Sequence, residues 1–288
     1  MKDVGMKPES YRTAIATGIL HAPPHCIELL RNGNTDKGDA LKTARIAGIL
    51  GAKRTDELIP LCHPLPIYRA DVEYELEEAH VVITAVVETI GPTGVEMEAL
   101  TAVSLAGLTL YDMLKPHCEP EELCLDQVKL GQKKGGKSHF TRVLKEPLPA
   151  SVIVLSDTVA SGKKADTAGQ NVMEILEEAN FGFIHYQVIP DSPEQLKALI
   201  EQQKNDYPLI LTVGGTGLGP KDLTVETIQP LLTREIPGLM EAARSFGQRR
   251  TPYAALSRGV AGYIENSLIL TLPGSRQGAK ESLMAILP

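Results

Sequence analysis

The sequence predicts two consecutive domains, an α+β domain followed by an α/β domain with three layers and a mainly parallel sheet. Its 288 residues are many for a single hydrophobic core. Residues 143–150, VLKEPLPA, hold two prolines and no periodic pattern, so the domain boundary belongs there. After this segment strand patterns alternate with helix patterns, as they do in parallel sheets covered by helices. We therefore expect domains at residues 1–145 and 150–288.

The first domain is expected to have the element order β-α-β-β-α-β. Alternation of polar and apolar residues predicts two strands joined by a short turn, and no element is predicted before Pro23. The predicted elements are a strand at Cys26–Leu30, a helix at Lys37–Lys53, strands at Tyr68–Leu76 and Val81–Ile90, a helix at Gly94–Lys115 and a strand at Leu123–Leu130. This order is typical of a ferredoxin-like sheet with two helices on one face.

The predicted helix at Gly94–Lys115 is apolar on every side and yet charged at both ends. Glu96 and Glu98 lie in its first turn, and Asp112 lies one turn before Lys115. Ionisable groups on a buried helix cost free energy unless they are paired or used. Helix capping explains an acid at the first turn and a lysine at the last, but not Asp112, which is at the wrong end for the macrodipole. We therefore expect these groups to be functional.

The length of this helix limits how its charged groups can act. Glu98 and Asp112 are fourteen residues apart, which corresponds to about 21 Å along one helix. They cannot hold one small substrate from the same helix. Either each end serves a different part of a site, or a neighbouring subunit completes the site.

A glycine-rich segment, GQKKGGKS at residues 131–138, satisfies the P-loop pattern GxxxxGK[ST]. A P-loop requires a helix that begins at its Lys-Ser pair, and here a proline-containing linker follows shortly afterwards. A P-loop nucleotidase is therefore kept only as an alternative. A flexible basic loop that binds anions through Lys133, Lys134 and Lys137 is the interpretation that we favour.

In the second domain the predicted strands and helices alternate. The strands are Ser151–Leu155, Ile184–Ile189, Leu209–Val213 and Leu268–Leu272, and the helices are Thr167–Ala179 and Pro193–Gln203. Ligands bind at the carboxyl ends of strands in open α/β sheets, so we expect the functional residues of this domain there.

Two features follow strands of this second sheet. The segment GGTGLGPKD, residues 214–222, has glycines that let backbone N–H groups approach phosphate, although Pro220 stands where GxGxxG needs its last glycine. Asp191 and Asp222 also follow strands and together suit a magnesium ion that bridges nucleotide phosphates. Either acid alone is also explained by capping of the helix that follows it.

Composition excludes several classes of protein. The net charge is −7 and acidic residues outnumber basic ones in both halves, so nucleic acid is not an expected partner. No apolar run reaches the roughly 18 residues of a membrane span. The four cysteines form no CxxC pair, and the N-terminus has no apolar signal region, so we expect a cytoplasmic protein with free thiols.

The motifs LIPLCHPL, GVEMEAL, LYDMLK and KKGGKS, in this order over residues 1–142, resemble the cyclic pyranopterin monophosphate synthase (MoaC) family. The resemblance implies conversion of (8S)-3′,8-cyclo-7,8-dihydroguanosine 5′-triphosphate to cyclic pyranopterin monophosphate and pyrophosphate. It implies a homo-oligomer whose site lies at a subunit interface, and no particular cofactor. Two positions depart from the family pattern, Asp36 before KGD and His139 after GGKS.

The same resemblance implies the roles of individual residues. The catalytic positions are Asp112, Lys115 and Lys133. The substrate-binding positions are Lys37, Arg45, Cys62, His63, Glu96, Met97, Glu98 and Lys137, of which Lys37, Arg45 and Lys137 would hold the triphosphate. A lysine can shuttle protons if burial or neighbouring cations lower its pKa.

The motifs LSDTVASG, VIPD, TVGGTGLGPKD, REIPG, LSRGVAG and LTLPGS resemble the molybdopterin adenylyltransferase (MoaB/MogA) group. The resemblance implies AMP transfer from Mg-ATP to molybdopterin, with Mg²⁺ and ATP as cofactors. Asp191 and Asp222 match the catalytic acids and the possible magnesium ligands. The nucleotide and pterin positions are Gly214, Gly215, Thr216, Gly217, Ser257, Pro273, Gly274 and Ser275.

Together the two resemblances imply a bifunctional protein of molybdenum cofactor biosynthesis, whose partners are small pterins and nucleotides. An alternative remains for the second domain, because the group contains members that lack activity. In that alternative it is a silent module that binds pterin or forms oligomers.

Overall fold

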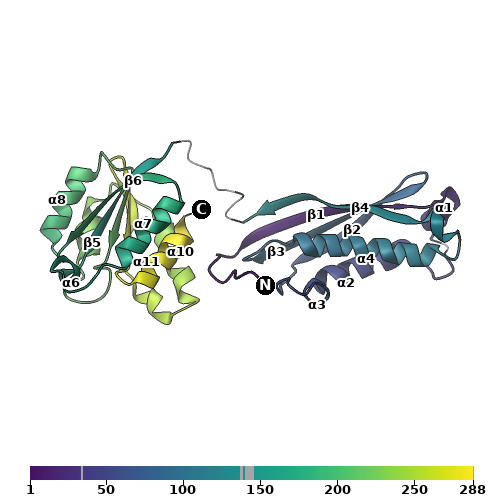
Figure 1. The fold of residues 1–288 in the computed structure, drawn as a ribbon, viewed down its shortest axis with the longest axis horizontal. Helices are drawn as coiled ribbons and strands as arrows, with labels where there is room; N and C mark the ends of the chain where they lie inside the picture. Colours follow the sequence, from purple (N-terminus) through teal and green to yellow (C-terminus); the bar gives the residue numbers. More distant parts are fainter. Residues whose placement is uncertain (34, 137–138, 140–145, 288) are drawn as a thin grey trace. The chain divides into compact units, whose positions relative to one another are not determined.

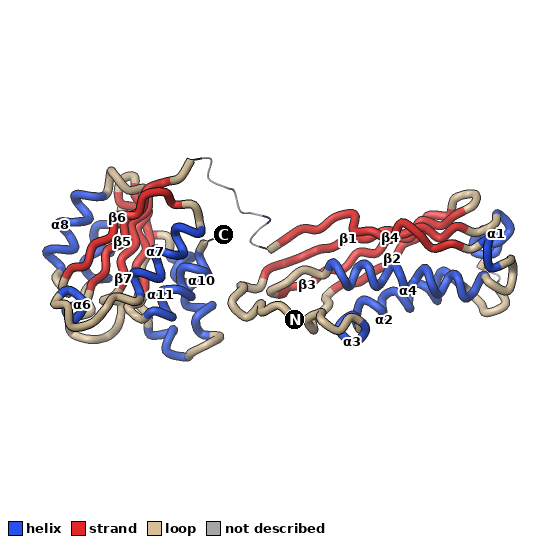
Figure 2. Tube along the Cα trace, in the orientation of Figure 1, coloured by secondary structure: helices blue, strands red, loops and turns tan. Residues whose placement is uncertain are grey.

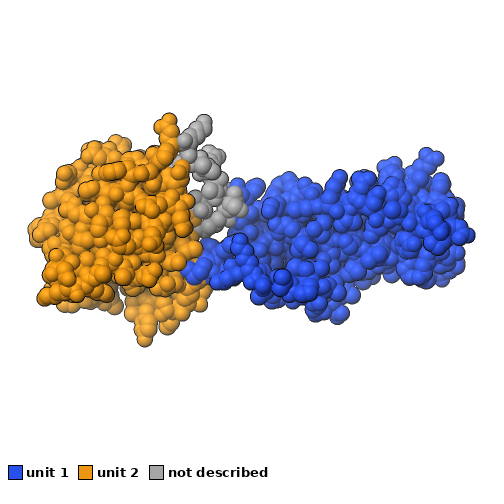
Figure 3. All heavy atoms as spheres, in the orientation of Figure 1, with its two compact units in different colours: residues 1–140 blue, residues 141–288 orange. Residues whose placement is uncertain are grey.

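The computed structural model describes residues 1–33, 35–136, 139 and 146–287. It divides into two compact units, residues 1–140 and 141–288 (Figure 3). The predicted boundary at residues 143–150 begins outside the described residues, so its exact position stays a prediction.

Unit 1 contains one antiparallel sheet with the strand order β2-β3-β1-β4. The strands are β1 (Ser10–His21), β2 (Arg69–Leu76), β3 (His80–Gly91) and β4 (Cys124–Gly135). Burial alternates along β3, where Val81, Ile83, Ala85 and Val87 are fully buried, because one face of the sheet is covered by helices. The predicted hairpin of two strands is confirmed as β2 and β3.

The first strand lies upstream of its predicted place. The predicted strand Cys26–Leu30 is wrong, because these residues belong to the helix α1 (Pro24–Asn32). Proline at the first helical position and Gly33 with φ +66° at the end supply the start and stop signals of a helix. The strand is instead β1, which was not predicted because small and polar residues dilute its alternation.

Two long helices cover one face of this sheet and lie side by side (Figures 1 and 2). They are α2 (Ala40–Lys53) and α4 (Glu96–Leu114), accompanied by the short helices α3 (Thr55–Leu58) and η1 (Pro120–Glu122). The prediction of one continuous helix at α4 is confirmed. Its outer side is not covered within one chain, since Leu108 is 54% exposed and Met97 is 39% exposed.

Unit 2 contains a mixed sheet of six strands in the order β6-β5-β7-β10-β9-β8. Four neighbouring strands are parallel, β6 (Phe181–Ile189), β5 (Leu148–Leu155), β7 (Leu209–Val213) and β10 (Ser267–Leu272). Two antiparallel strands extend one edge, β9 (Ala261–Ile264) and β8 (Arg234–Glu235). The strands that the sequence predicted are the parallel ones, and the antiparallel edge was not predicted.

Helices cover both faces of this second sheet (Figures 1 and 2). One face packs against α7 (Ala168–Glu178), α10 (Pro237–Gln248) and α11 (Arg276–Ile286), and the other against α8 (Pro193–Gln203) and α9 (Thr224–Ile228). Short helices complete the unit, α6 (Asp157–Ala160), η2 (Gln229–Leu231) and η3 (Pro252–Leu256). Within the described part of the chain, no helix is long and apolar enough to cross a membrane.

We predict that Gly48→Ala destabilises unit 1 by about 1–3 kcal/mol. A Cβ at Gly48 would lie 2.9 Å from the carbonyl oxygen of Ala102 and 2.8 Å from Val72, so α2 would have to move away from α4. Thermal unfolding of the full chain measures the loss. Gly238→Ala in α10 is the control, because its Cβ would meet nothing within 4 Å. Equal unfolding temperatures for Gly48→Ala and the unaltered chain would contradict the prediction.

Candidate functional sites

At the carboxyl end of α4, one carboxylate is held between two lysines. Lys37 Nζ lies 2.6 Å from Asp112 Oδ2 and 3.0 Å from the Asp112 carbonyl oxygen. Lys115 Nζ lies 2.8 Å from Asp112 Oδ1. The hydrogen bonds from Lys115 and then Lys37 lower the pKa of Asp112 to about 2. Two positive charges therefore surround one negative charge, which leaves a net positive site that suits an anionic ligand.

This arrangement changes the role expected of Lys115. The hydrogen bond to Asp112 raises the pKa of Lys115, whereas the sequence argument required burial or nearby cations to lower it. In one chain Lys115 thus keeps its proton at neutral pH. It can donate a proton or bind an anion, but it is not a base unless substrate draws Asp112 away.

At the amino end of α4, the carboxyl group of Glu98 is buried, with only 4% of the residue exposed. Burial, followed by the nearby charges of Glu96 and Asp56, raises the pKa of Glu98 to about 7. Burial and then Glu98 also raise the pKa of the Cys62 thiol. A carboxyl group that titrates near neutral pH can both accept and donate a proton, so Glu98 is a candidate proton-transfer group of unit 1.

At the same end of α4, Glu96 lines a small cavity of about 240 Å³ with basic walls. Lys133 Nζ on β4 is 3.3 Å from Glu96 Oε1. Arg12 on β1 donates to the carbonyl oxygens of Gly91 (2.9 Å) and Pro92 (3.1 Å), which holds its guanidinium at the cavity wall. Sequence reasoning missed Arg12 because it lies in the unpredicted strand β1.

The glycine-rich segment does not form a P-loop over its described residues. Residues 131–135 belong to β4, and Gly135 and Gly136 have φ of +96° and +78°. A Cβ at Gly135 would lie 2.0 Å from the Tyr11 carbonyl oxygen, so the glycine is required by close strand packing. Lys137 and Ser138 lie outside the described residues.

The remaining predicted residues of unit 1 are placed as follows. His63 Nε2 lies 2.7 Å from the Lys2 carbonyl oxygen, and Met97 is partly exposed beside Glu96 and Glu98. The residues at the two ends of α4 form two clusters, one of Lys37, Asp112 and Lys115 and one of Glu96 and Lys133. Arg45 pairs with Asp71 at 2.7 Å, so in one chain it belongs to neither cluster. Glu96 of one cluster and Asp112 of the other are sixteen residues apart on α4, which corresponds to about 24 Å. The predicted catalytic residues Lys115 and Lys133 are therefore not brought together within one chain.

In unit 2 the glycine loop after β7 is shaped by backbone packing. Gly214 and Gly215 have φ of +113° and +64°. A Cβ at Gly214 would lie 2.4 Å from the Leu155 carbonyl oxygen, and one at Gly215 would lie 2.1 Å from Thr224 Oγ1. Only glycine fits both positions, and the loop is thereby held against the carboxyl ends of β5 and β10.

Two acids lock together the ends of β5 and β6. The backbone N–H of Asp157 donates to Asp191 Oδ2, and that of Asp191 donates to Asp157 Oδ1, both at 3.1 Å. Lys221 pairs with Asp157 and lowers its pKa. Sequence reasoning missed Asp157 and Lys221, although both stand in motifs that it quoted, LSDTVASG and GLGPKD.

Helix capping does not account for Asp191 or Asp222. Ser192, rather than Asp191, caps α8 by accepting from the Gln195 N–H. Asp222 Oδ2 accepts from the Gly219 N–H at 2.7 Å, within its own turn. Asp191, Asp222 and the glycine loop line one cavity of about 190 Å³, so the structure brings these predicted residues together.

The same two acids fit a magnesium ion. Magnesium is usually held by one or two carboxylates, waters and substrate phosphates rather than by an all-protein cage. Among the described residues, no group of three or more His, Cys, Asp or Glu side chains could hold a metal. Asp191 and Asp222 would therefore hold the ion together with phosphate oxygens.

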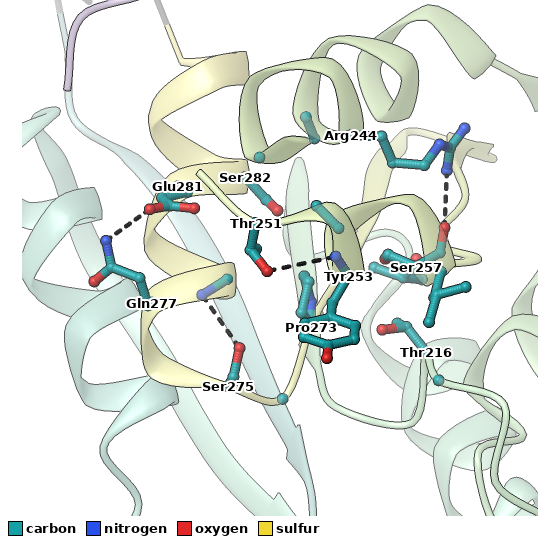
Figure 4. A pocket seen from close by; sticks show the side chains of 18 of the residues that line it. Thr216, Arg244, Thr251, Tyr253, Ser257, Pro273, Ser275, Gln277, Glu281 and Ser282 are labelled. Carbon is teal, nitrogen blue, oxygen red and sulfur yellow. Dashed lines mark hydrogen bonds between the residues drawn. The ribbon is translucent and has the colours of Figure 1, made fainter. Parts of the chain in front are cut away.

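A larger cavity of about 570 Å³ extends from the glycine loop to α10, η3 and α11 (Figure 4). Of the predicted residues it contains Gly215, Thr216, Gly217 and Asp222 at one end and Ser257, Pro273, Gly274 and Ser275 along its walls. Ser275 also caps α11 by accepting from the Gly278 N–H at 3.2 Å. Sequence reasoning missed Arg244, which donates to the Ser257 carbonyl oxygen, and also Arg250, Tyr253 and Glu281, because these residues follow no strand.

Comparison with known proteins gives two family matches and full-length relatives. Residues 1–136 match the model of the MoaC family, and residues 151–288 match a model described as "Probable molybdopterin binding domain". A protein of Chlorobaculum tepidum named molybdenum cofactor biosynthesis bifunctional protein is 40% identical over 289 residues, covering 100% of this chain and 91% of that protein.

Two further proteins match one half of the chain each. The cyclic pyranopterin monophosphate synthase of Thermomicrobium roseum is 49% identical over 140 residues, which are 48% of this chain and 83% of that protein. The crystal structure of the molybdopterin biosynthesis enzyme MoaB from Thermus thermophilus is 44% identical, covers 49% of this chain and 90% of that one, and has a TM-score of 0.47.

We predict that Glu98→Gln removes a pH dependence from the stability of unit 1. The folded pKa of about 7 lies above the ordinary value of 4.5. The stabilising contribution of Glu98 is therefore fully present below pH 4.5 and is lost as the pH rises through about 7. Because glutamine stays neutral, Glu98→Gln should gain up to about 3 kcal/mol relative to the unaltered chain between pH 4.5 and pH 8.

Denaturant unfolding at both pH values measures this difference. Glu75→Gln, an exposed carboxyl on β2, is the matched control and should show no such gain. Stability curves of Glu98→Gln and the unaltered chain that stay parallel over this pH range would overturn the assignment of Glu98 as a buried acid.

Proposed function

Because the chain belongs to the family of molybdenum cofactor biosynthesis bifunctional proteins, we propose that its two units catalyse two separate steps of that pathway. Unit 1 converts (8S)-3′,8-cyclo-7,8-dihydroguanosine 5′-triphosphate to cyclic pyranopterin monophosphate and pyrophosphate. Unit 2 transfers AMP from Mg-ATP to molybdopterin. The four antiparallel strands with two helices on one face support a ferredoxin-like topology for unit 1.

The observation that carries the proposal for unit 1 is the pair of complementary clusters at the two ends of α4. One end offers the protonated lysines Lys37 and Lys115 around Asp112. The other offers Lys133 and Arg12 in a cavity lined by Glu96, and the buried acid Glu98 in the same first turn of the helix. A triphosphate with a ring system that must be opened and rebuilt needs both anion binding and proton transfer.

The distance between the clusters favours a site built by two copies of the chain. Groups about 24 Å apart on one helix cannot contact one small substrate. In a dimer with two-fold symmetry, the carboxyl end of one α4 can face the amino end of the partner's α4, and two equivalent sites result. The exposed Leu108 on the outer side of α4 is suited to such a contact.

Within such a site each group has a chemical task. Lys37, Lys115 and Lys133 bind phosphate oxygens and stabilise the negative charge that develops as pyrophosphate leaves. Lys115 donates a proton, since Asp112 keeps it charged. Glu98 accepts and returns a proton during ring opening and pterin closure, since its pKa is close to neutrality.

In unit 2 the proposal rests on the convergence of the glycine loop with Asp191 and Asp222 at one edge of the sheet. Backbone N–H groups of residues 215–217 bind the ATP phosphates, whereas the N–H of Gly214 donates to the Leu272 carbonyl oxygen. The two acids would hold Mg²⁺, which neutralises charge on the phosphates and polarises them. A phosphate oxygen of molybdopterin then attacks the α-phosphorus, the bond to the β-phosphate breaks, and pyrophosphate leaves.

We predict that Lys115→Ala and Lys133→Ala each abolish formation of cyclic pyranopterin monophosphate, and that mixing the two restores it. Random assembly of dimers from both variants leaves about a quarter of the sites intact, because each mixed dimer has one site without either substitution. The two proteins are denatured together, refolded and assayed with the cyclised GTP-derived substrate.

A mixture of Asp112→Asn with Lys115→Ala is the control, because both changes remove the same cluster and no intact site can form. Normal turnover in either single variant would contradict the catalytic assignment. Inactive single variants that fail to complement each other would instead contradict the two-chain site.

We predict that Asp222→Asn lowers AMP transfer by the full chain by at least about 100-fold while ATP still binds. The measurement is formation of adenylylated molybdopterin from Mg-ATP. Asp206→Asn, an exposed acid outside the cavity, is the control. If the unaltered chain binds molybdopterin but transfers no AMP, unit 2 is a silent module and this part of the proposal is wrong.

A further inference from the structure

The far end of the large cavity in unit 2 contains a buried acid that the proposed reaction does not use. Glu281 on α11 lines the cavity and is only 5% exposed. Its Oε1 accepts a hydrogen bond from Gln277 Nε2 at 2.7 Å and lies 3.4 Å from Arg250 Nε. Figure 4 shows Glu281 next to Gln277 on the turns of α11 that border the cavity. A buried carboxyl group is costly, so its presence at a cavity wall needs a reason.

The carboxylate is held in place by groups from two elements. Arg250 follows α10, and its guanidinium lies 3.9 Å from the ring centre of Phe246 and donates to the Phe246 carbonyl oxygen at 3.0 Å. Gln277 is one turn before Glu281 on α11. Both recorded bonds fall on Oε1, and a carboxylate has about four lone-pair positions in all. Capacity to accept further hydrogen bonds therefore remains on a rigidly placed group.

The space beside this carboxylate suits a flat ring. Met240, Ala243 and Gly247 on α10 form an apolar wall, and Pro273 lies across the cavity. Tyr253, which is 77% exposed, stands at the rim and can cover a bound ring. Ligand pockets of this kind are mostly apolar, with a few placed polar groups that decide orientation. Among the polar groups that line this cavity, Glu281 is the buried carboxylate, and a carboxylate can only accept hydrogen bonds.

An acceptor of this kind distinguishes the two heterocycles that the proposed reaction brings to unit 2. The pterin ring presents two neighbouring donors, the 2-amino group and N3–H. Adenine presents a donor next to an acceptor, so a carboxylate facing that edge would meet a lone pair. A buried acceptor that faces another acceptor loses its hydrogen bond and weakens binding. Sites of this kind reject an analogue in this way.

We infer that Glu281 is the specificity-determining residue for the pterin, binding its 2-amino and N3–H edge at the α10–α11 end of the cavity. This inference rests on the proposed function of unit 2. It also sets the direction of the substrates, with the pterin ring at Glu281 and the phosphates at residues 215–217. Arg250 acts as a positioning residue, because it holds the carboxylate rather than the ligand.

The test compares two fluorescent ligands, pterin and lumazine, on the full chain. Lumazine carries an oxygen where pterin carries the 2-amino group, so it offers an acceptor to Glu281. The unaltered chain should bind pterin about 10- to 100-fold more tightly than lumazine at this site. Glu281→Gln should lose most of that preference, because an amide can face either edge. Glu241→Gln, on the exposed side of α10, should leave both affinities unchanged.

A second variant guards against loss of folding in Glu281→Gln. Glu281→Asp keeps the charge opposite Arg250 but withdraws it by one methylene. This variant should bind pterin more weakly than the unaltered chain does, but still more tightly than it binds lumazine. Any pterin that binds to unit 1 is independent of Glu281 and remains in every variant. Pterin and lumazine affinities that are the same in Glu281→Gln, Glu281→Asp and the unaltered chain would overturn the inference.

AMP transfer, measured on the same proteins, separates this inference from the proposed function. If the preference for pterin depends on Glu281 but no AMP is transferred, the adenylylation proposal is contradicted and the pterin site is supported. AMP transfer that proceeds with an unchanged KM for molybdopterin in Glu281→Gln supports the reaction and overturns the role of Glu281. Displacement of pterin by adenosine in the unaltered chain but not in Glu281→Gln would show an adenine site there, and would also overturn it.

Discussion

The packing of α4 against the sheet and against α2 is the constraint on which unit 1 depends. Its inner side is built of small and branched residues that are almost fully buried, Ala99, Ala102, Val103, Ala106 and Leu110. Gly48 lets α2 approach the α4 backbone closely. A helix held along its whole length in this way is straight and rigid, so its charged ends stay about 24 Å apart. The organisation of the site follows from that separation.

In the proposed function the two units bind phosphate by different physical means. Unit 1 uses side-chain charges, the lysines around Asp112 and the basic cavity next to Glu96. Unit 2 uses backbone geometry, because its glycine loop can approach phosphate only where no Cβ stands in the way. Side-chain charges that lie at exposed helix ends can be shared between chains. A backbone loop fixed between β5, β7 and β10 completes its part of the site within one chain.

Some elements were predictable from local pattern and others were not. Strand β7 and helix α8 coincide with their predicted ranges, because β-branched runs and a capped amphipathic turn are local signals. Strand β1 was missed since five of its twelve residues are Ala, Thr or Gly, and what makes it a strand is pairing with β3 and β4 on both sides. The prediction of a strand at Cys26–Leu30 was wrong for a related reason. Five residues that are mostly apolar suit a strand or a helix equally, and the nearby Pro24 and Gly33 decide in favour of a helix.

For the proposed sites, the sequence by itself determined the candidate residues: the acids of α4, Lys115 after it, the glycine loop, Asp191 and Asp222. Those residues stand in contiguous motifs, and motifs are visible without a fold. Only the tertiary structure decided how they act. The burial that raises the pKa of Glu98, the two lysines that lower that of Asp112, the lock between Asp157 and Asp191, and the carboxylate of Glu281 in a cavity wall all depend on residues far apart in the chain. Desolvation and charge pairing are set by neighbours in space, and a linear sequence does not contain them explicitly.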